Sequence, residues 1–249
     1  DGRTEIGAET QIFSFAAIYG VACFVMVLFL LDETAPPRDH ATGALHRVMR
    51  SYSLLIKSRN FVYLAFGNSL VYSAMFAWLA GLAFVLIDAL KLSAGGAGIW
   101  FGISVSGFIV GSALAGRLAK SIFPLQTALL GAVICLAASV IGSLLAVSGH
   151  MELWNLLTTG FFMMAGIGFA IPPATGAGIA PFPEMAGAAS SLIGFVQGGL
   201  SSLSVLAVGY LYDGTARPML LQMAGLTALG LMFFIPLLKY LKTPVLPRS

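Results

Sequence analysis

Charged residues are scarce in this chain of 249 residues, where Asp, Glu, Lys and Arg together make up 9% of the total. An ordinary soluble domain carries about 25%. By contrast, 58% of the residues are hydrophobic and the mean hydropathy is +0.93. A water-soluble fold could not cover its surface with so few charges. The composition excludes a disordered chain, a nucleic-acid binder and a soluble enzyme, and it predicts a protein surrounded by lipid.

Cysteine is also rare, and a signal peptide is lacking. Cys23 and Cys135 both lie in apolar runs, where each would need a partner within the bilayer, so we expect two small buried side chains and no disulfide. Residues 1–11 are polar and hold three acids, which does not fit a signal peptide. Because the chain begins with Asp1 and not Met, we expect a piece of a longer polypeptide or a processed one.

Long apolar runs dominate the rest of the sequence. A helix needs about 20 mostly apolar residues to cross the bilayer, and backbone groups in lipid must pair within their own segment. The runs lack the alternating ten-residue segments of a β-barrel. We therefore predict an all-α membrane protein with seven transmembrane helices, at 12–31, 61–87, 98–116, 125–147, 153–180, 185–211 and 218–241.

Most links between these runs are short, which predicts antiparallel neighbours. The exception is the long polar link Asp32–Asn60. Within it, Leu45, Met49, Tyr52 and Ile56 recur at helical spacing. This pattern predicts a short amphipathic helix along the membrane surface, with an ordinary solvated linker as the alternative.

The links between the predicted helices lie alternately on the two sides of the membrane. Lys and Arg residues are unevenly divided between these two sides. The positive-inside rule assigns the richer side to the cytoplasm, so the long link and the C-terminus are predicted to be cytoplasmic. The poorer side holds Arg3, Lys91 and Arg217. The richer side holds Arg38, Arg47, Arg50, Lys57, Arg59, Arg117, Lys120, Lys239, Lys242 and Arg248.

An odd number of helices, split by a basic linker into one and six, suggests half of a larger transporter. Many transporters consist of two six-helix halves. We therefore interpret 1–31 as an external stub and the last helix of a missing first half. Residues 32–60 form the cytoplasmic linker, 61–241 the six-helix second half, and 242–249 a cytoplasmic tail.

No ionisable residue lies near the centre of any predicted span, and no nucleophile–base pair, nucleotide loop or set of metal ligands is present. We expect no enzyme, no cofactor and no bound metal. A proton-carrying acid, where transport is proton-coupled, would belong to the absent half.

Small residues recur at four-residue spacing, which allows helices to approach closely. In the third span one row is Gly98, Gly102 and Ser106, and a second is Gly107, Gly111 and Ala115. In the sixth span a small, mildly polar stripe indicates either tight packing or a face that lines a cavity; its members are Ser190, Gly194, Gln197, Ser201 and Ser204.

Four residues are candidates for a substrate cavity. Asn68, Tyr72 and Met75 share one face of the second span, and Gln197 is the least lipid-compatible residue of the sixth. An amide, a phenol and a thioether on one face suit amphipathic, partly aromatic ligands. The alternative for the amides is an interhelical hydrogen bond.

The fifth span contains the pair Pro172–Pro173. Two adjacent prolines remove two backbone donors, so we predict a break in this helix and a bend at a cytoplasmic gate. Gly194 is the hinge candidate on the sixth span.

Several segments resemble major facilitator drug exporters, most closely the bicyclomycin and chloramphenicol resistance (Bcr/CflA) group. Residues 180–194, APFPEMAGAASSLIG, resemble the stretch P-x-x-A-G-x-A-S-(S/A)-L-x-G between the tenth and eleventh helices of that group. Ile12-Phe13 with the later 32–34, DET, is similar to its sixth helix and exit, and 52–61, YSLLIKSRNF, to the entry into its seventh.

The resemblance implies helices six to twelve of a twelve-helix protein in a bacterial inner membrane. It implies export of small hydrophobic or cationic drugs in exchange for protons, with the proton-binding acids on the missing first half. Two segments depart from the family pattern. Residues 116–120, GRLAK, only partly match a basic cytoplasmic loop of the superfamily, and Arg117 is expected to pair with acids there. Thr10-Gln11 stands where the family has W-R before its sixth helix.

Two other functions stay open at this point. One is a major facilitator transporter of a metabolite. A site for a charged metabolite usually needs a fixed counter-charge in the cavity, which the predicted spans of this chain lack and the other half could supply. A non-transporting membrane scaffold is disfavoured by the glycine rows and the double proline, and a membrane enzyme by the lack of any catalytic set.

Overall fold

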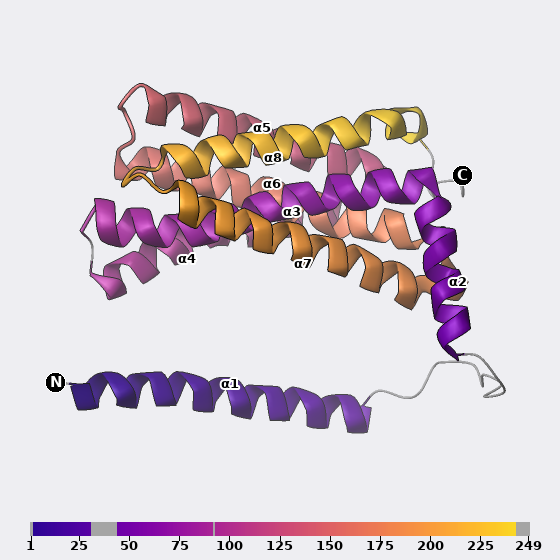
Figure 1. Cartoon of the computed structure of the whole chain (residues 1–249), viewed down its shortest axis with the longest axis horizontal. Coiled ribbons are helices and arrows are strands. Elements are labelled where there is room, and N and C mark those ends of the chain that lie inside the picture. Colours follow the sequence, from indigo (N-terminus) through magenta and orange to yellow (C-terminus); the bar gives the residue numbers. More distant parts are fainter. Residues whose placement is uncertain (1, 31–43, 92, 243–249) are drawn as a thin grey trace. The chain divides into compact units, whose positions relative to one another are not determined.

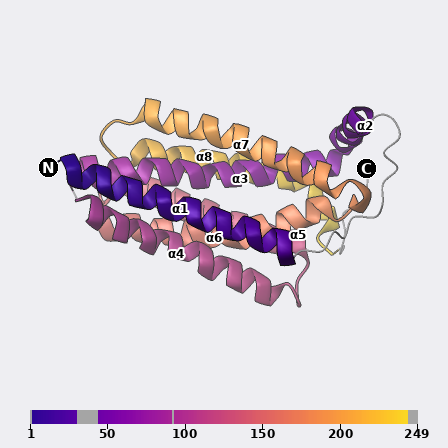
Figure 2. The same ribbon diagram turned by 90° about the horizontal axis from the view of Figure 1, so that it is seen from below.

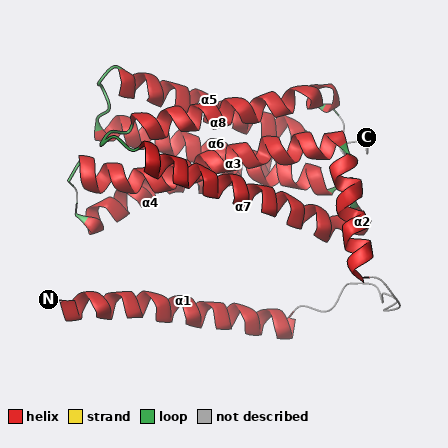
Figure 3. Cartoon of the chain, in the orientation of Figure 1, coloured by secondary structure: helices red, strands yellow, loops and turns green. Residues whose placement is uncertain are grey.

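The computed structural model describes residues 2–30, 44–91 and 93–242. Every regular element in these ranges is a helix (Figures 1 and 3), and they contain no strand. Internal contacts divide the chain into two units, 1–44 and 45–249, which are described separately. The division falls inside the predicted linker, 32–60.

The first unit is a single helix, α1 (Gly2–Leu30). Its apolar part includes Phe13–Phe29, which lies within the first predicted span, 12–31. The beginning of the predicted extended link, from Asp32 onward, lies outside the described residues.

The second unit contains six helices that are long and apolar enough to cross a membrane. They confirm the last six predicted spans and run antiparallel along the chain, joined by short links (Figure 1). Their bounds are α3 (Arg59–Phe84), α4 (Ala94–Leu118), α5 (Pro124–Val147), α6 (Leu153–Ile179), α7 (Ala186–Leu211) and α8 (Arg217–Phe234). Short irregular helices extend or precede three of them, namely η1 (Val85–Ala89) after α3, η2 (Pro183–Met185) before α7 and η3 (Ile235–Tyr240) after α8.

The bundle has two groups of three helices. In one group α3 packs against both α7 and α8, and in the other α6 packs against both α4 and α5. Figure 2 shows α3, α7 and α8 lying together. Contacts of α3 with α6 and of α5 with α8 join the groups. The central helices α3 and α6 are therefore the most deeply buried, as their share of buried residues also shows.

Large side chains fill the centre of the bundle. Trp78 is fully buried and lies against Gly160, where a Cβ atom would collide with the indole ring. Cys135 is also fully buried and its thiol donates to the backbone oxygen of Met163. Both cysteines are free, as predicted.

The predicted amphipathic helix of the linker exists as α2 (Ala44–Lys57) and lies across one end of the bundle (Figure 1). Its contact with the bundle includes a residue outside the face predicted to lie along the membrane surface. Leu55 is fully buried beside Phe61 and Phe182, whereas Met49 and Ile56 of the predicted face are 64% and 60% exposed on the protein. The side chain of Leu45 lies outside the described residues, and the contact of this face with a membrane stays a prediction.

The two glycine rows of α4 have different surroundings. Cβ atoms at Gly107 and Gly111 would collide with the carbonyls of Phe161 and Ala165, so α4 and α6 approach closely along this row. Cβ atoms at Gly98 and Gly102 would meet no described atom within 4 Å. Only the second row is therefore a packing seam within the described bundle.

The predicted break at Pro172–Pro173 is wrong, because α6 continues through both prolines to Ile179. Pro172 cannot donate to the carbonyl of Gly168, four residues earlier. The hydroxyl of Ser112, on α4, donates to that carbonyl instead, at 3.3 Å. Ser and Thr side chains of neighbouring helices commonly satisfy backbone groups that a membrane proline leaves free, and here the substitution keeps the helix intact.

The α4–α6 seam predicts opposite effects for two matched substitutions. Gly111→Ala should lower the free energy of unfolding by about 1–3 kcal/mol, because the rigid backbone of Ala165 cannot move aside. Gly102→Ala, one row away, should be neutral or stabilising by up to about 1 kcal/mol through helix propensity. Unfolding in mild detergent with added dodecyl sulfate measures both values, and equal effects would contradict the seam.

The Ser112 bond predicts a coupling between two residues on different helices. Ser112→Ala should cost about 0.6–1.7 kcal/mol, the range of interhelical hydrogen bonds in membranes. In a Pro172→Ala background the restored N–H reaches Gly168, so the same change should cost nearly nothing. A double-mutant cycle in the same unfolding assay measures the coupling; additive effects would mean that Ser112 does not replace the proline's missing donor.

Candidate functional site

A groove of about 730 Å³ lies between α3 and α7. Three of the residues singled out from the sequence line it together: Tyr72 on α3, and Gly194 and Gln197 on α7. All three lie near the middle of their helices, which is the depth at which many transporters bind their substrates. The remaining lining residues are Phe76, Gly198, Ser201, Ser202, Val205 and Leu206.

Two polar side chains in this groove are available to a ligand. Neither the hydroxyl of Tyr72 nor the amide of Gln197 has a hydrogen-bond partner in the described part of the chain. The Tyr72 ring packs against Phe76 with their centroids 5.3 Å apart, so the groove also offers an aromatic wall. Cβ atoms at Gly194 and Gly198 would meet nothing within 4 Å, which means that the absence of side chains there keeps the groove wide.

A chain of polar contacts that begins at Ser201 of the groove fixes α7 on α3. The hydroxyls of Ser73 and Ser201 lie 3.4 Å apart, and Ser204 donates to the backbone oxygen of Ser73 at 2.9 Å. Gln222 of α8 donates to the hydroxyl of Ser204 at 2.9 Å. The sequence stripe included both serines of α7, but sequence reasoning missed Ser73 and Gln222 because isolated polar residues do not reveal their partners.

Asn68 and Met75 do not line this groove. Asn68 is 1% exposed, and its amide nitrogen donates to the hydroxyl of Thr175 on α6 at 3.0 Å. Its amide oxygen is buried without a hydrogen-bond partner among the described residues. Met75 packs against the central core. The face predicted on α3 is thus divided, with Tyr72 at the groove, Asn68 buried inside the bundle and Met75 half-buried against the core.

The gate candidates lie close to this interhelical bond. Thr175 follows Pro172 and Pro173 within one turn of α6, so the bond from Asn68 ties α3 to α6 just beyond the prolines. Arg117 is exposed in the last turn of α4. It makes no ion pair with a described residue, and its pairing with acids stays a prediction.

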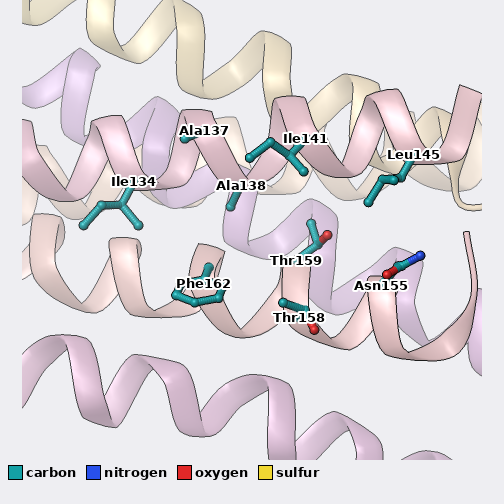
Figure 4. A pocket seen from close by; sticks show the side chains of 9 residues that line it. All are labelled: Ile134, Ala137, Ala138, Ile141, Leu145, Asn155, Thr158, Thr159 and Phe162. Atoms are coloured by element: carbon teal, nitrogen blue, oxygen red, sulfur yellow. The ribbon is translucent and has the colours of Figure 1, made fainter.

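A second hollow, of about 400 Å³, lies between α5 and α6 and is lined mainly by aliphatic side chains such as Ile134 and Ile141 (Figure 4). Two of its polar side chains are engaged by backbone oxygens. Thr158 donates to Trp154 at 2.7 Å, and Asn155 donates to His150 at 2.7 Å. The hydroxyl of Thr159 and the amide oxygen of Asn155 remain as polar groups in this hollow, but none of its lining residues is one of the candidates singled out from the sequence.

The α3/α7 groove has an uncharged and partly aromatic lining. Its lining includes no Asp, Glu, Lys, Arg or His. An aromatic ring, a phenol, an amide and aliphatic walls suit a ligand that is largely apolar with few polar groups.

Comparison with known proteins gives a family match over most of the chain. Residues 10–205 match the Major Facilitator Superfamily. One relative, the "Bicyclomycin resistance protein homolog" of Haemophilus influenzae, is 23% identical over 90% of this chain and 56% of its own length. The "Uncharacterized MFS-type transporter YdgK" of Bacillus subtilis is 26% identical over 92% of this chain and 56% of its own length.

A third relative, "Multidrug resistance protein MdtM" of Escherichia coli O157:H7, is 30% identical over 65% of this chain and 39% of its own length. The chain thus spans about half the length, or less, of these curated relatives. Six membrane-length helices agree with a fragment of such a fold. The chain belongs to the Major Facilitator Superfamily of membrane transporters and is a multi-pass integral membrane protein.

Proposed function

We propose that this chain is the C-terminal portion of a secondary active transporter that exports small hydrophobic or cationic drugs in exchange for protons. The α3/α7 groove carries the proposal, because a phenol and an amide without hydrogen-bond partners in the described chain lie there beside an aromatic wall, near the middle of their helices. The names of the bicyclomycin and multidrug resistance relatives support the same class of cargo. The membrane would be a bacterial inner membrane, with the C-terminus in the cytoplasm.

Within the groove, Tyr72 and Gln197 would contact the substrate directly. The aromatic rings of Tyr72 and Phe76 would attract flat or cationic molecules through their faces, and Gln197 would select among them by hydrogen bonding. Asn68 and Met75 stay predictions as substrate contacts. Asn68 is buried and bonded to Thr175, so it would reach a ligand only after α3 moves relative to α6, and Met75 is half-buried outside the groove.

The proposed mechanism is alternating access, in which two six-helix halves rock around a central site. In this half, Pro172, Pro173 and Gly194 are the proposed points of bending. The Asn68–Thr175 bond lies beside the prolines and would open or close with them. The coupling acids would lie on the other half, since no ionisable side chain lines the groove.

The same lack of charge favours drugs over charged metabolites as cargo. A site for a charged metabolite would hold that charge with a fixed counter-charge, because an unpaired charge in a low-dielectric site is costly. This half supplies none in the groove.

Transport by the full-length protein tests the function, with Gln197 as the test of the site. Vesicles containing it should move ethidium when a proton gradient is imposed, and a protonophore should stop the movement. Gln197→Leu should change the ratio of rates for two drugs of different polarity by about twofold to tenfold, the value of one hydrogen bond. Absence of any proton-dependent transport across a panel of compounds would overturn the function.

Two tyrosines provide the matched control. Tyr72→Phe removes a hydroxyl from the groove, whereas Tyr210→Phe removes one from a side chain of α7 that is 91% exposed. Only the first should change the drug preference, with protein levels equal by immunoblot. If Gln197→Leu and Tyr72→Phe both leave the preference unchanged while transport persists, the groove is not the site.

The proposed sidedness has its own test. Lys91 precedes α4, which begins at Ala94, and Arg117 lies in its last turn, which ends at Leu118, so cysteines at these two positions should lie on opposite faces of the membrane. In a cysteine-free background, an impermeant maleimide should label Lys91→Cys in intact cells and Arg117→Cys only after lysis. Labelling of both from outside would refute the span between them, and a reversed pattern would refute a cytoplasmic C-terminus.

A further inference from the structure

A third groove, of about 760 Å³, lies between α7 and α8. The helices α7 and α8 both pack on α3 but touch each other little. The groove between them therefore lies on the side of α7 opposite to the α3/α7 groove. Its walls are aliphatic, with Leu200, Leu203 and Ala207 on α7 and Leu221 and Leu226 on α8.

The one amide in this groove is turned away from a ligand. Gln222 donates from its amide nitrogen to the backbone oxygen of Ser204 at 2.8 Å and to its hydroxyl at 2.9 Å. Its amide oxygen is buried. The surface offered by the middle of the groove is therefore apolar.

The mouth of the groove, by contrast, holds two opposite charges, Asp213 and Arg217. Asp213 accepts hydrogen bonds from the backbone N–H of Thr215 at 2.9 Å and from its hydroxyl at 2.6 Å. These bonds hold the pKa of the Asp213 carboxyl below its usual value, so the group stays ionised at neutral pH.

Arg217 is held in place at the same mouth. It donates from Nε to the backbone oxygen of Ala146 at 2.8 Å and from Nη2 to that of Val147 at 3.4 Å. Both acceptors are neutral carbonyls, and Arg217 forms no direct ion pair with a described residue. Its positive charge acts on Asp213 at longer range and contributes to the lowered pKa of that carboxyl, so the two charges lie near each other at the mouth without direct contact.

The mouth lies at the level of an aromatic belt. Trp100 and Trp154, near the beginnings of α4 and α6, pack edge to face with centroids 5.6 Å apart. At the same end, Tyr212 donates its hydroxyl to the backbone oxygen of Phe84 at 3.3 Å. Trp and Tyr gather at the depth of lipid headgroups, so the two charges lie where headgroups are found.

The depth of the groove also matches one leaflet. Its α7 wall runs from Leu200 to Leu211, which at the rise of an α-helix is about 16 Å. Half of the hydrocarbon core is about 15 Å. A molecule that fills the groove from mouth to end would therefore be about as long as one acyl chain of a phospholipid.

We propose that the α7/α8 groove is a binding site for one phospholipid with a zwitterionic, amine-bearing headgroup, of the phosphatidylethanolamine type. One acyl chain lies along the leucines, the phosphate meets Arg217, and the ammonium donates to Asp213. A zwitterionic headgroup supplies one charge for each charge at the mouth, and a primary ammonium adds N–H donors for Asp213 that a quaternary ammonium lacks. The site does not depend on the proposed transport function.

Lipid binding to the intact protein in detergent, measured by native mass spectrometry, tests the site. Phosphatidylethanolamine should bind more tightly than phosphatidylcholine, whose quaternary ammonium has no N–H to donate to Asp213. Asp213→Asn keeps an oxygen for Thr215 but removes the charge. It should weaken phosphatidylethanolamine binding by about twofold to fivefold, as expected for one exposed ion pair, and should reduce the preference over phosphatidylcholine.

Two tryptophan substitutions on α8 form the matched control. Leu221→Trp places a ring in the groove and should weaken binding about tenfold by displacing two methylene groups. Leu229→Trp alters a side chain on the same helix that is 49% exposed and is not part of the groove, so binding should be unchanged. Thermal unfolding in the same detergent verifies that both variants are folded.

Three outcomes would overturn the site. Equal binding in the Leu221→Trp and Leu229→Trp variants would place the lipid elsewhere. An unchanged preference for phosphatidylethanolamine in Asp213→Asn would remove the headgroup contact. If the unchanged protein is a dimer and Leu221→Trp makes it a monomer without changing the bound lipid, a second copy of the protein covers this surface.

Discussion

The structure depends on one requirement, that backbone polar groups inside a membrane find partners within the protein. Within the six helices most backbone N–H and C=O groups bond to one another, and side chains bond to some of the groups that have no partner in their own helix. The hydroxyl of Ser112 donates to the carbonyl of Gly168, to which Pro172 has no N–H to donate. Arg217 donates to two backbone carbonyls at the end of α5. Gln126 accepts from the backbone N–H of Phe123 at the beginning of α5. Because of these side-chain hydrogen bonds, the chain can contain prolines and short links while the backbone groups beside them stay bonded.

Close approach of helices is the second consequence of a lipid environment. Without a hydrophobic force between helices, packing relies on van der Waals contact and interhelical hydrogen bonds. Gly107 and Gly111 bring α4 onto α6, and serines join α3 to α7. Because α7 is fixed on α3 along one line, its two flanks are left for separate grooves. One is lined by free polar groups, and the other is apolar with charges at its mouth.

Much of the candidate site could be predicted from residue type alone. Gln197 stands out because an amide is unusual in a lipid-length helix, and the structure places it with Tyr72 and Gly194. Asn68 and Met75 share a helical face with Tyr72, yet they lie against α6 and the core. Helical spacing gives the direction of a side chain, but it cannot state which neighbouring helix occupies that direction.

The sequence by itself determined the number and approximate bounds of the six spans, because hydrophobic length is a local property of the chain. Only the tertiary structure decided which glycine row of α4 packs, which face of α2 is buried, and that α6 continues through Pro172 and Pro173. Each of these depends on an atom from a distant helix, such as the hydroxyl of Ser112, and the residues of one segment carry no record of that partner.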